Sequence, residues 1–383
     1  MGGGSGWLTL RQVLVSLGLA CSHTHVSASL RLLPRAFLWA SLCLTSSGCY
    51  AWQATTGQIS ILWNRQPIQE RLDDPRPLHP ERDAELRRKL KLVLDVRRFS
   101  MSGVGLEESQ SYTTFHDTGD EPVAWNVSGA RPDGLYPLTW TFPFIGTLPY
   151  VGFFKKTLAV ELLGELRASD KDALLLPIPA YSTLGWFDDP VFTAMLLRDE
   201  EDRIAEVVIH ELAHATVWIP DEVQLNENLA SFVGEEGARL YFLEQGGPDD
   251  PRLKAAAQSA RDSEVFNEAI GVLREELDRI FESNGEQARK LELKTAAIAR
   301  FRERYKSEVR SRLSDDRYDW VLEIELNNAI LLQFRRYHGE LKLFQALHAR
   351  CGNDLKATIR ALKEIADADD PRAALQARAR GKS

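Results

Sequence analysis

Apolar residues recur at helical spacing over the first long stretch of the chain whose pattern is regular. Between Asp83 and Phe99 they are Leu86, Leu90, Leu92, Val93 and Val96, which indicates one buried face of a helix. Residues 111–153 change character, with stretches such as SYTTFHD and EPVAWNVSG that are rich in aromatic and β-branched residues, Gly and Pro. That composition predicts short strands and turns.

The helical period returns in residues 154–168, and strands are then expected around Leu174–Ile178 and Ser182–Trp186. From about Asp199 onward the pattern is helical almost throughout. Two long charged segments, Arg252–Glu282 and Glu286–Leu313, are separated by Ser283-Asn284-Gly285. This predicts an antiparallel helical hairpin over residues 251–313, with Gly285 in the left-handed conformation.

Two more helices are expected after the hairpin, at Tyr318–Gly339 and Glu340–Ala366, so that residues 318–366 form a C-terminal helical part. The last fifteen residues are expected to be loose. Together these patterns predict an α+β fold that is mainly α-helical, with a small β-sheet beside the helix at residues 199–218 and a long helical hairpin.

Composition narrows the choice of partners. The chain has 383 residues and a formal net charge of −8, with 44% hydrophobic and 27% charged residues. No basic run stands out, which argues against nucleic acid as a partner, because phosphate binding needs clustered Lys and Arg. The four cysteines, Cys21, Cys43, Cys49 and Cys351, include no CxxC pair, so neither a cysteine zinc site nor a disulfide framework is indicated.

The N-terminal region has the features of an export signal. In RLLPRAFLWASLCLTSSGC (residues 31–49), two arginines precede an apolar run from Ala36 to Leu44, and small residues lead to Cys49. A cysteine in this position resembles a bacterial lipoprotein signal. The resemblance implies that Cys49 is lipidated and that residues 1–48 are a leader and signal segment, removed from a mature domain at 49–383. A disordered leader or an uncleaved anchor helix is the alternative.

The strongest chemical signal lies in EVVIHELAHATVW, residues 206–218. His210 and His214 are four residues apart and share one face of the predicted helix, so they can occupy two corners of a zinc tetrahedron. Glu211 lies about 100° around the helix, where it can reach a metal-bound water as a general base without coordinating the metal. The alternative is an amphipathic core helix with two structural histidines. A third metal ligand is needed to distinguish the zinc site from the core helix.

Glu227 is the preferred third ligand. It lies in LNENLASFV, where a second helix is expected to begin near Asn226 and to pack its apolar face on the first. Two histidines and a glutamate with one open position form the ligand set of a hydrolytic zinc enzyme. Glu235 and Glu236 are alternatives deeper in that helix, but Glu236 lies about 180° around the helix from Glu227.

An HExxH motif followed by a helix that opens with NExxA resembles the gluzincins, the metallopeptidases related to thermolysin and the zinc aminopeptidases. In that group the glutamate of NExxA is the third ligand, which corresponds to Glu227. Here only twelve residues, 215–226, separate His214 from Glu227, fewer than is usual. A narrower resemblance, to a bacterial family of predicted zinc aminopeptidases, is carried by CYAWQATTGQISIL, SYTTFHD, VAWNVSG, TWTFPFIGTLPYVGFF, AYSTLGWFDDP, HELAH, LNENLASFVGEEG and ELNNA.

The resemblance also implies a zincin-like core with a substrate-binding edge strand and a donor to the oxyanion. The strand corresponds to Ala180–Phe187, where Tyr181, Ser182 and Gly185 are the candidate substrate contacts, although a buried strand that fills the core would show the same pattern. The candidate donor is Tyr337, with His338, Tyr181, Tyr241 and His116 as alternatives. An acidic anchor for the substrate's α-amine is expected at Glu121, Asp188 or Asp189.

These observations predict a zinc metallopeptidase with one Zn²⁺, which acts on peptides, most simply as an aminopeptidase. Its expected location is the bacterial cell envelope, as a periplasm-facing lipoprotein held to a membrane by its lipid. The alternatives are a non-catalytic envelope lipoprotein that uses a zincin-like scaffold, and a metal amidohydrolase that acts on cell-wall peptides.

Overall fold

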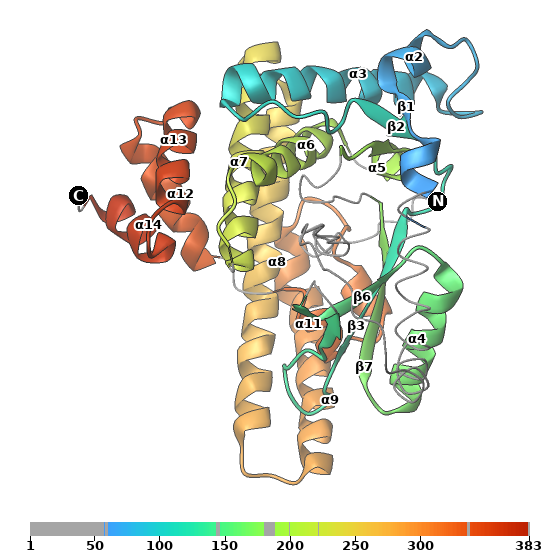
Figure 1. Cartoon of the computed structure of the whole chain (residues 1–383). Helices are drawn as coiled ribbons and strands as arrows, with labels where there is room; N and C mark the ends of the chain where they lie inside the picture. Colours follow the sequence, from blue (N-terminus) through green and yellow to red (C-terminus); the bar gives the residue numbers. More distant parts are fainter. Residues whose placement is uncertain are drawn as a thin grey trace, which may run out of the picture.

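The computed structural model describes residues 57, 60–142, 146–179, 188–198, 200–220, 222–334 and 338–381. The signal segment, Cys49 and the strand expected at Ser182–Trp186 lie outside these residues. Helices make up most of the described chain, and the strands are few and short, so the predicted mainly α-helical α+β class is confirmed. Figure 1 shows a helical layer at the top, a small sheet below it and a long helical hairpin that extends downward.

The main sheet has three antiparallel strands in the order β6-β3-β7, with β3 in the centre. Its strands form where the aromatic and β-branched residues predict them, and helices α4 and α11 pack against β3 and β7. A second sheet joins β1, β2 and β8, and β4 pairs with β5. The strands are β1 Gln66–Pro67, β2 Thr114–His116, β3 Ala124–Ala130, β4 Trp140–Phe142, β5 Gly146–Leu148, β6 Tyr150–Phe153, β7 Asp172–Ile178 and β8 Val191–Phe192.

The largest hydrophobic core lies among the helices of the upper layer. The helix predicted at Asp83–Phe99 is α3, with these bounds, and its predicted apolar residues are all buried. It packs against α5, α6 and α7, and a π-helical turn at Ser100–Val104 ends it. The helices that precede the hairpin in the chain are α2 Ile68–Asp73, α3 Asp83–Phe99, α4 Lys156–Ala168, α5 Thr193–Arg198, α6 Glu201–Thr216 and α7 Val223–Gly246.

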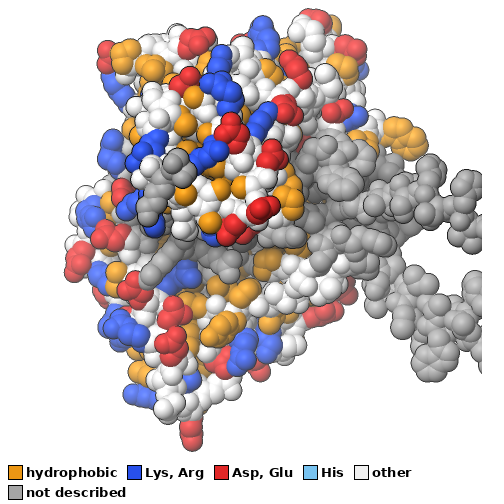
Figure 2. All heavy atoms as spheres, turned by 60° about the vertical axis from the view of Figure 1, so that its left-hand side comes forward, with side chains coloured by type: hydrophobic (Ala, Val, Ile, Leu, Met, Phe, Trp, Pro, Cys, Tyr) orange, Lys and Arg blue, Asp and Glu red, His pale blue; other side chains and the backbone are white. Residues whose placement is uncertain are grey.

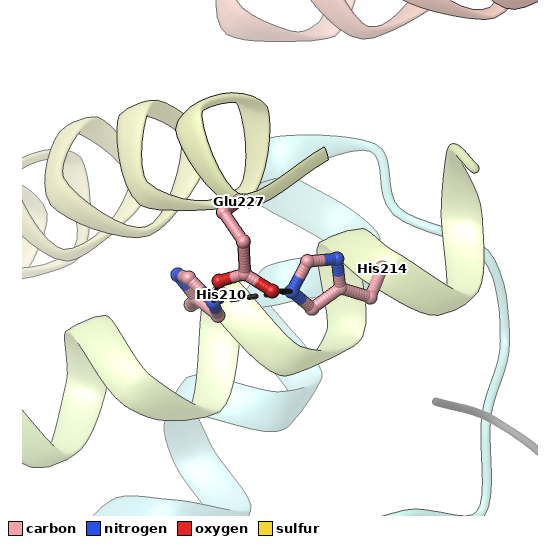
Figure 3. Close-up of side chains that lie close together, drawn as sticks. All are labelled: His210, His214 and Glu227. Atoms are coloured by element: carbon pink, nitrogen blue, oxygen red, sulfur yellow. Dashed lines mark hydrogen bonds and ion pairs between the residues drawn. The ribbon is translucent and has the colours of Figure 1, made fainter. Parts of the chain in front are cut away.

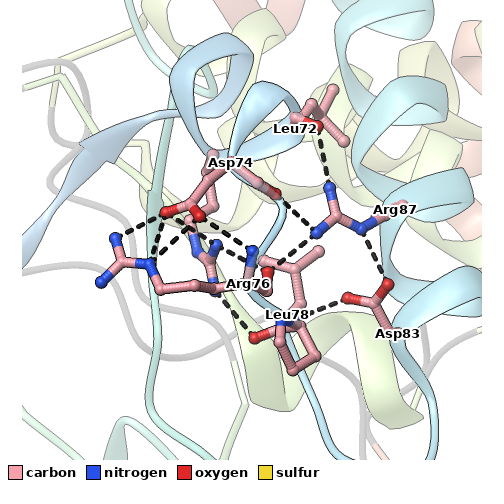
Figure 4. Close-up of polar contacts among 8 residues, drawn as sticks. Leu72, Asp74, Arg76, Leu78, Asp83 and Arg87 are labelled. Atoms are coloured by element: carbon pink, nitrogen blue, oxygen red, sulfur yellow. Dashed lines mark hydrogen bonds and ion pairs between the residues drawn. The ribbon is translucent and has the colours of Figure 1, made fainter.

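A polar network holds the segment before α3 against that helix (Figure 4). The guanidinium of Arg87 donates hydrogen bonds to the carbonyl oxygens of Leu72 (2.8 Å), Asp74 (2.9 Å) and Arg76 (2.9 Å). It also donates to the carboxylate of Asp83 at 2.8 Å. One rigid guanidinium thus binds the last turn of α2 and two carbonyls of the loop that follows it, so the loop is held in place without regular secondary structure.

The predicted hairpin is formed by α8 (Pro251–Glu282) and α9 (Gln287–Arg304), and a π-helical turn at Tyr305–Val309 continues it. The prediction of a left-handed Gly285 is wrong, because its φ is not positive. The chain leaves α8 through Ser283 (φ −65°, ψ 152°) and enters α9 through Glu286 (φ −62°, ψ 148°), both extended. Two extended residues reverse the chain here, so no left-handed residue is needed.

The C-terminal part differs from prediction in three respects. The single helix expected at Glu340–Ala366 is divided into α12 (His338–Arg350) and α13 (Leu355–Ala366), because Gly352 (φ 73°) and Asn353 (φ 57°) are left-handed and end the first helix. The helix expected at Tyr318–Gly339 is broken into α10 (Trp320–Glu323) and α11 (Asn328–Leu331), because Asn327 is extended and caps α11 through a hydrogen bond from the Ile330 N–H. The residues expected to be loose contain α14. That helix buries Leu375 and Ala379 and is capped by Asp370. The remaining helices are α12 His338–Arg350, α13 Leu355–Ala366 and α14 Pro371–Arg380.

The surface carries both signs of charge. On the face drawn in Figure 2, Lys and Arg side chains alternate with Asp and Glu, and neither sign forms a continuous patch. None of the described helices combines the length and the apolar composition that crossing a lipid bilayer requires. Cys351, the cysteine within the described residues, is a free thiol.

The side chain of Asn328 joins α11 to the turn after β3, which yields a first prediction. It is fully buried and donates hydrogen bonds to the carbonyl oxygens of Arg131 (2.8 Å), Pro132 (3.1 Å) and Gly134 (3.1 Å). We expect Asn328→Ala to lower the free energy of unfolding by about 2–3 kcal/mol, because these carbonyls lose their donor. Urea unfolding measures this change. The exposed Asn284→Ala is the control, expected within about 0.5 kcal/mol of wild type.

Candidate metal centre

Two adjacent helices supply the candidate site. Helix α6 begins with Glu201 and Asp202 in its first turn, where acidic side chains interact favourably with the helix dipole. His210 and His214 lie one turn apart near its C-terminal end. Helix α7 begins at Val223, three residues earlier than predicted, so Glu227 lies just beyond its first turn. It projects toward the histidines, as Figure 3 shows.

The three side chains converge closely. His210 Nε2 and His214 Nε2 are 3.2 Å apart. Glu227 Oε2 lies 3.6 Å from His210 Nε2, and Glu227 Oε1 lies 3.6 Å from His214 Nε2. All three residues are buried, at 8%, 3% and 6% exposure for His210, His214 and Glu227. The carboxylate therefore straddles the two imidazoles, and the sequence prediction that these residues meet agrees with this geometry.

This geometry and chemistry fit a zinc ion. Two atoms about 2.0–2.1 Å from one ion at the tetrahedral angle lie roughly 3.3–3.4 Å apart, close to the 3.2 and 3.6 Å observed here. The ligand atoms of the three residues all lie within 4.8 Å of one another. Two imidazoles and one carboxylate form a donor set typical of hydrolytic zinc sites. The group could therefore hold a metal ion.

His214 is in the protonation state that a ligand requires. Burial lowers the pKa of its imidazole to about 3, with a further decrease from His210 that Glu227 partly offsets. The ring is therefore neutral near pH 7, and one nitrogen carries a free lone pair. Its Nδ1 is buried and has no hydrogen-bond partner among the described residues.

Glycines in α7 allow the two helices to approach closely. A Cβ atom on Gly234 would lie 2.8 Å from the carbonyl oxygen of Glu206 and 3.1 Å from the Cβ of His210. A Cβ on Gly237 would lie 2.9 Å from Ile209 Cγ2. Gly234 follows Glu227 by two helical turns and so lies on the same face. Because Gly234 and Gly237 have no side chains, α7 lies close enough to α6 for Glu227 to reach the histidines.

The short connection between the helices is fixed by the residue before Glu227. Asn226 is fully buried, and its side chain binds both polar groups of the Ile219 backbone. Its Oδ1 accepts from Ile219 N–H at 2.8 Å, and its Nδ2 donates to Ile219 C=O at 2.7 Å. These two hydrogen bonds satisfy the backbone N–H and C=O of Ile219 within the connection. Twelve residues are therefore enough to return the chain from His214 to Glu227.

Glu211, the predicted general base, is buried at 7% exposure beside the first histidine. Its charge, after burial itself, raises the pKa of the buried Tyr112 hydroxyl, and Asp189 contributes in the same direction. Tyr112 has a φ of 64° and donates its backbone N–H to the Asp189 carbonyl at 2.7 Å. The buried carboxylate of Glu211 thus lies near enough to a strained aromatic residue to affect its hydroxyl electrostatically.

The other candidate residues have varied positions. Tyr181, Ser182, Gly185 and Tyr337 lie outside the described residues, and their roles stay predictions. The alternative ligand Glu236 forms ion pairs with Arg239 and His348. The rings of Tyr241 and His116 pack against Phe99 and Phe192, respectively. Of the three acidic anchor candidates, Asp189 alone is buried, whereas Glu121 and Asp188 are exposed.

Three residues near the site were not identified from the sequence: Tyr112, Trp218 and Gly234. Trp218 directly follows the HELAH helix, and its ring contacts His214. Gly234 lies seven residues after Glu227, a spacing that places both on one helix face and could have identified it. No local pattern in the sequence places Tyr112 beside Glu211, because about one hundred residues separate them.

Comparison with protein families gives one match. The model of a family described as "Putative aminopeptidase" matches residues 49–376, which include the whole site and most of the chain. No curated protein and no solved structure matches the chain.

The close helix approach predicts the effect of a small substitution. We expect Gly234→Ala to lower the free energy of unfolding by about 1–3 kcal/mol, because the added methyl group forces α7 away from α6. The shift also moves Glu227 from the histidines, so zinc affinity should fall at least about tenfold, a cost of roughly 1.4 kcal/mol. Urea unfolding and zinc competition against a chromogenic chelator measure the two effects.

Gly271→Ala in α8 is the matched control, because nothing lies within 4 Å of the position of its Cβ. Alanine favours helix over glycine, so this variant should gain about 0.5–1 kcal/mol of stability with unchanged zinc affinity. Equal behaviour of the two alanine variants would contradict the role assigned to Gly234.

Proposed function

Because the chain belongs to the "Putative aminopeptidase" family, we propose that it is a zinc-dependent peptidase, with aminopeptidase action as its most specific form. One observation carries the zinc dependence. His210, His214 and Glu227, from two different helices, meet in a buried group with the spacing of a tetrahedral site. A chance pair of histidines on a core helix would not require a buried carboxylate from a second helix to face both of them.

In this proposal the three residues hold the ion as in a gluzincin, within a zincin-like core. Zinc would supply a Lewis acid that polarises the scissile carbonyl and increases the acidity of the attacking water. His210 and His214 act as neutral donors, and the charge of Glu227 offsets part of the charge of the ion.

Glu211 moves the proton. Its carboxylate accepts a proton from the water that attacks the peptide carbonyl and then delivers that proton to the leaving amine. Its position directly after His210 in α6, at 7% exposure, supports this role. Tyr337 remains the proposed donor to the oxyanion, and Tyr181, Ser182 and Gly185 the proposed substrate-binding strand.

We also propose that the protein is a lipoprotein of the cell envelope, anchored at Cys49. The apolar run and small residues that precede this cysteine support the proposal, and the family match begins at the same residue. One acyl chain gives only marginal membrane binding, so stable anchoring requires more than one chain on the cysteine.

Substitution of Glu211 separates catalysis from metal binding. We expect Glu211→Gln to lower kcat for peptide hydrolysis by about 10²–10⁴-fold, the usual contribution of a general base. Its zinc content should stay at that of wild type, because Glu211 is not a proposed ligand. His214→Ala should lose both zinc and activity, and a chelator should inactivate the wild type. Atomic absorption and hydrolysis of aminoacyl and longer peptides measure these effects.

Glu235→Gln is the matched control, since this exposed glutamate of α7 was an alternative ligand. It should keep both its zinc and its activity. Wild type that contains no zinc after purification in zinc buffer, or a Glu211→Gln variant with the wild-type rate, would refute the proposal.

A further inference from the structure

Trp218 is an exposed aromatic residue whose two neighbours in the chain are buried. It is 39% exposed, whereas Val217 and Ile219 on either side are 3% and 2% exposed. A large apolar ring that contributed only to the core would be covered, because its stabilising effect depends on removal from water. The structure instead leaves a substantial part of this ring open to solvent.

The backbone around Trp218 is held on both sides. Val217 N–H donates to the carbonyl of Ala213 at 2.9 Å, at the end of α6. Asn226 binds both the N–H and the C=O of Ile219. With the neighbouring residues fixed, the indole is presented outward in a defined position. Such preorganisation lowers the entropic cost of binding a ligand.

The same ring also contacts a residue of the candidate metal centre. The centroids of the Trp218 and His214 rings are 5.9 Å apart, with an angle of 66° between their planes. The indole thus lies between a proposed zinc ligand and solvent. In the proposed peptidase, a peptide that approached the ion from the solvent side of His214 would place a neighbouring side chain close to this ring.

The carboxylate in the connection next to Trp218 does not favour a basic substrate side chain. Glu222, whose N–H bonds to the Ile219 carbonyl, has its carboxylate bound to Arg372 at 2.6 Å. That carboxylate is therefore already neutralised and adds little attraction for a Lys or Arg of a substrate. The ring itself offers a flat apolar face, which pairs well with aromatic and bulky aliphatic groups.

We propose that Trp218 is a specificity-determining residue, whose indole packs against an aromatic or bulky aliphatic side chain flanking the scissile bond. This inference rests on the proposed peptidase function, and it assigns the substrate class at the same site.

Peptide binding to the zinc-loaded Glu211→Gln protein tests the inference without turnover. Isothermal titration would use tripeptides that differ in one residue, with Phe, Leu, Lys or Gly at each position in turn. At one position we expect the Phe and Leu peptides to bind about tenfold more tightly than the Gly peptide, as expected for one aromatic contact. Adding Trp218→Ala should remove this preference, and Trp218→Phe should retain most of it.

Tyr136→Ala is the matched control, because Tyr136 is an exposed aromatic residue (65%) on the turn after β3. It should leave the preference intact. Peptides that bind without preference, a preference that survives Trp218→Ala, or tightest binding by the Lys peptide would each overturn the inference. Loss of zinc in Trp218→Ala would also overturn it, because Trp218 would then support His214 rather than contact substrate.

Failure of the proposed function gives a different result. In that case the Glu211→Gln protein holds no zinc, or binds none of the peptides whichever residue is varied. The proposed function and the inference about Trp218 are then both wrong. When the protein holds zinc and binds peptides, the inference is tested by whether the peptide preference depends on Trp218.

Discussion

The close packing of α6 against α7 is the constraint on which the rest of the site depends. Burial of two imidazoles and two carboxylates in a hydrophobic core is unfavourable unless the groups compensate one another or bind an ion. The apolar contacts between the two helices must offset this unfavourable free energy. They are made by buried residues such as Ile209, Leu212, Leu229 and Val233. These contacts form only because Gly234 and Gly237 leave room for the opposite backbone.

The surrounding elements hold this pair from several sides. Helix α3 packs against both α6 and α7, and the polar network around Arg87 ties the N-terminal loop to α3. On another face of α7, Phe232 stacks with Phe344 of α12, and His348 bonds to Thr358 of α13 at 2.8 Å. Helix α7 is therefore buried on two sides, so Glu227 has a fixed backbone from which to project.

The sequence predicted elements well where local pattern and packing agree. Asp83–Phe99 has one clear apolar face, and the structure keeps its bounds. Glu227 was predicted because NENLA opens an amphipathic helix after a short connection. Prediction failed where long-range contacts decide. Asn328 binds a turn almost two hundred residues away, which breaks an otherwise helical pattern, and α14 is ordered by burial of Leu375 against earlier helices. The electrostatic effect of Glu211 on Tyr112 is equally non-local.

The short connection between His214 and Glu227 bears on whether a substrate has room beside the metal centre. A tight turn that folded back over the histidines would block them. Here Val217 is extended (φ −135°, ψ 117°), so α6 ends before it. Asn226 then fixes the backbone of Ile219 through two hydrogen bonds. Trp218 in this connection is 39% exposed, and its ring contacts that of His214, with 5.9 Å between the centroids. Asn226 thus braces the backbone beside the third ligand, and Trp218 places a partly exposed aromatic ring next to His214. A short connection can therefore position Glu227 and still leave an aromatic face open to solvent.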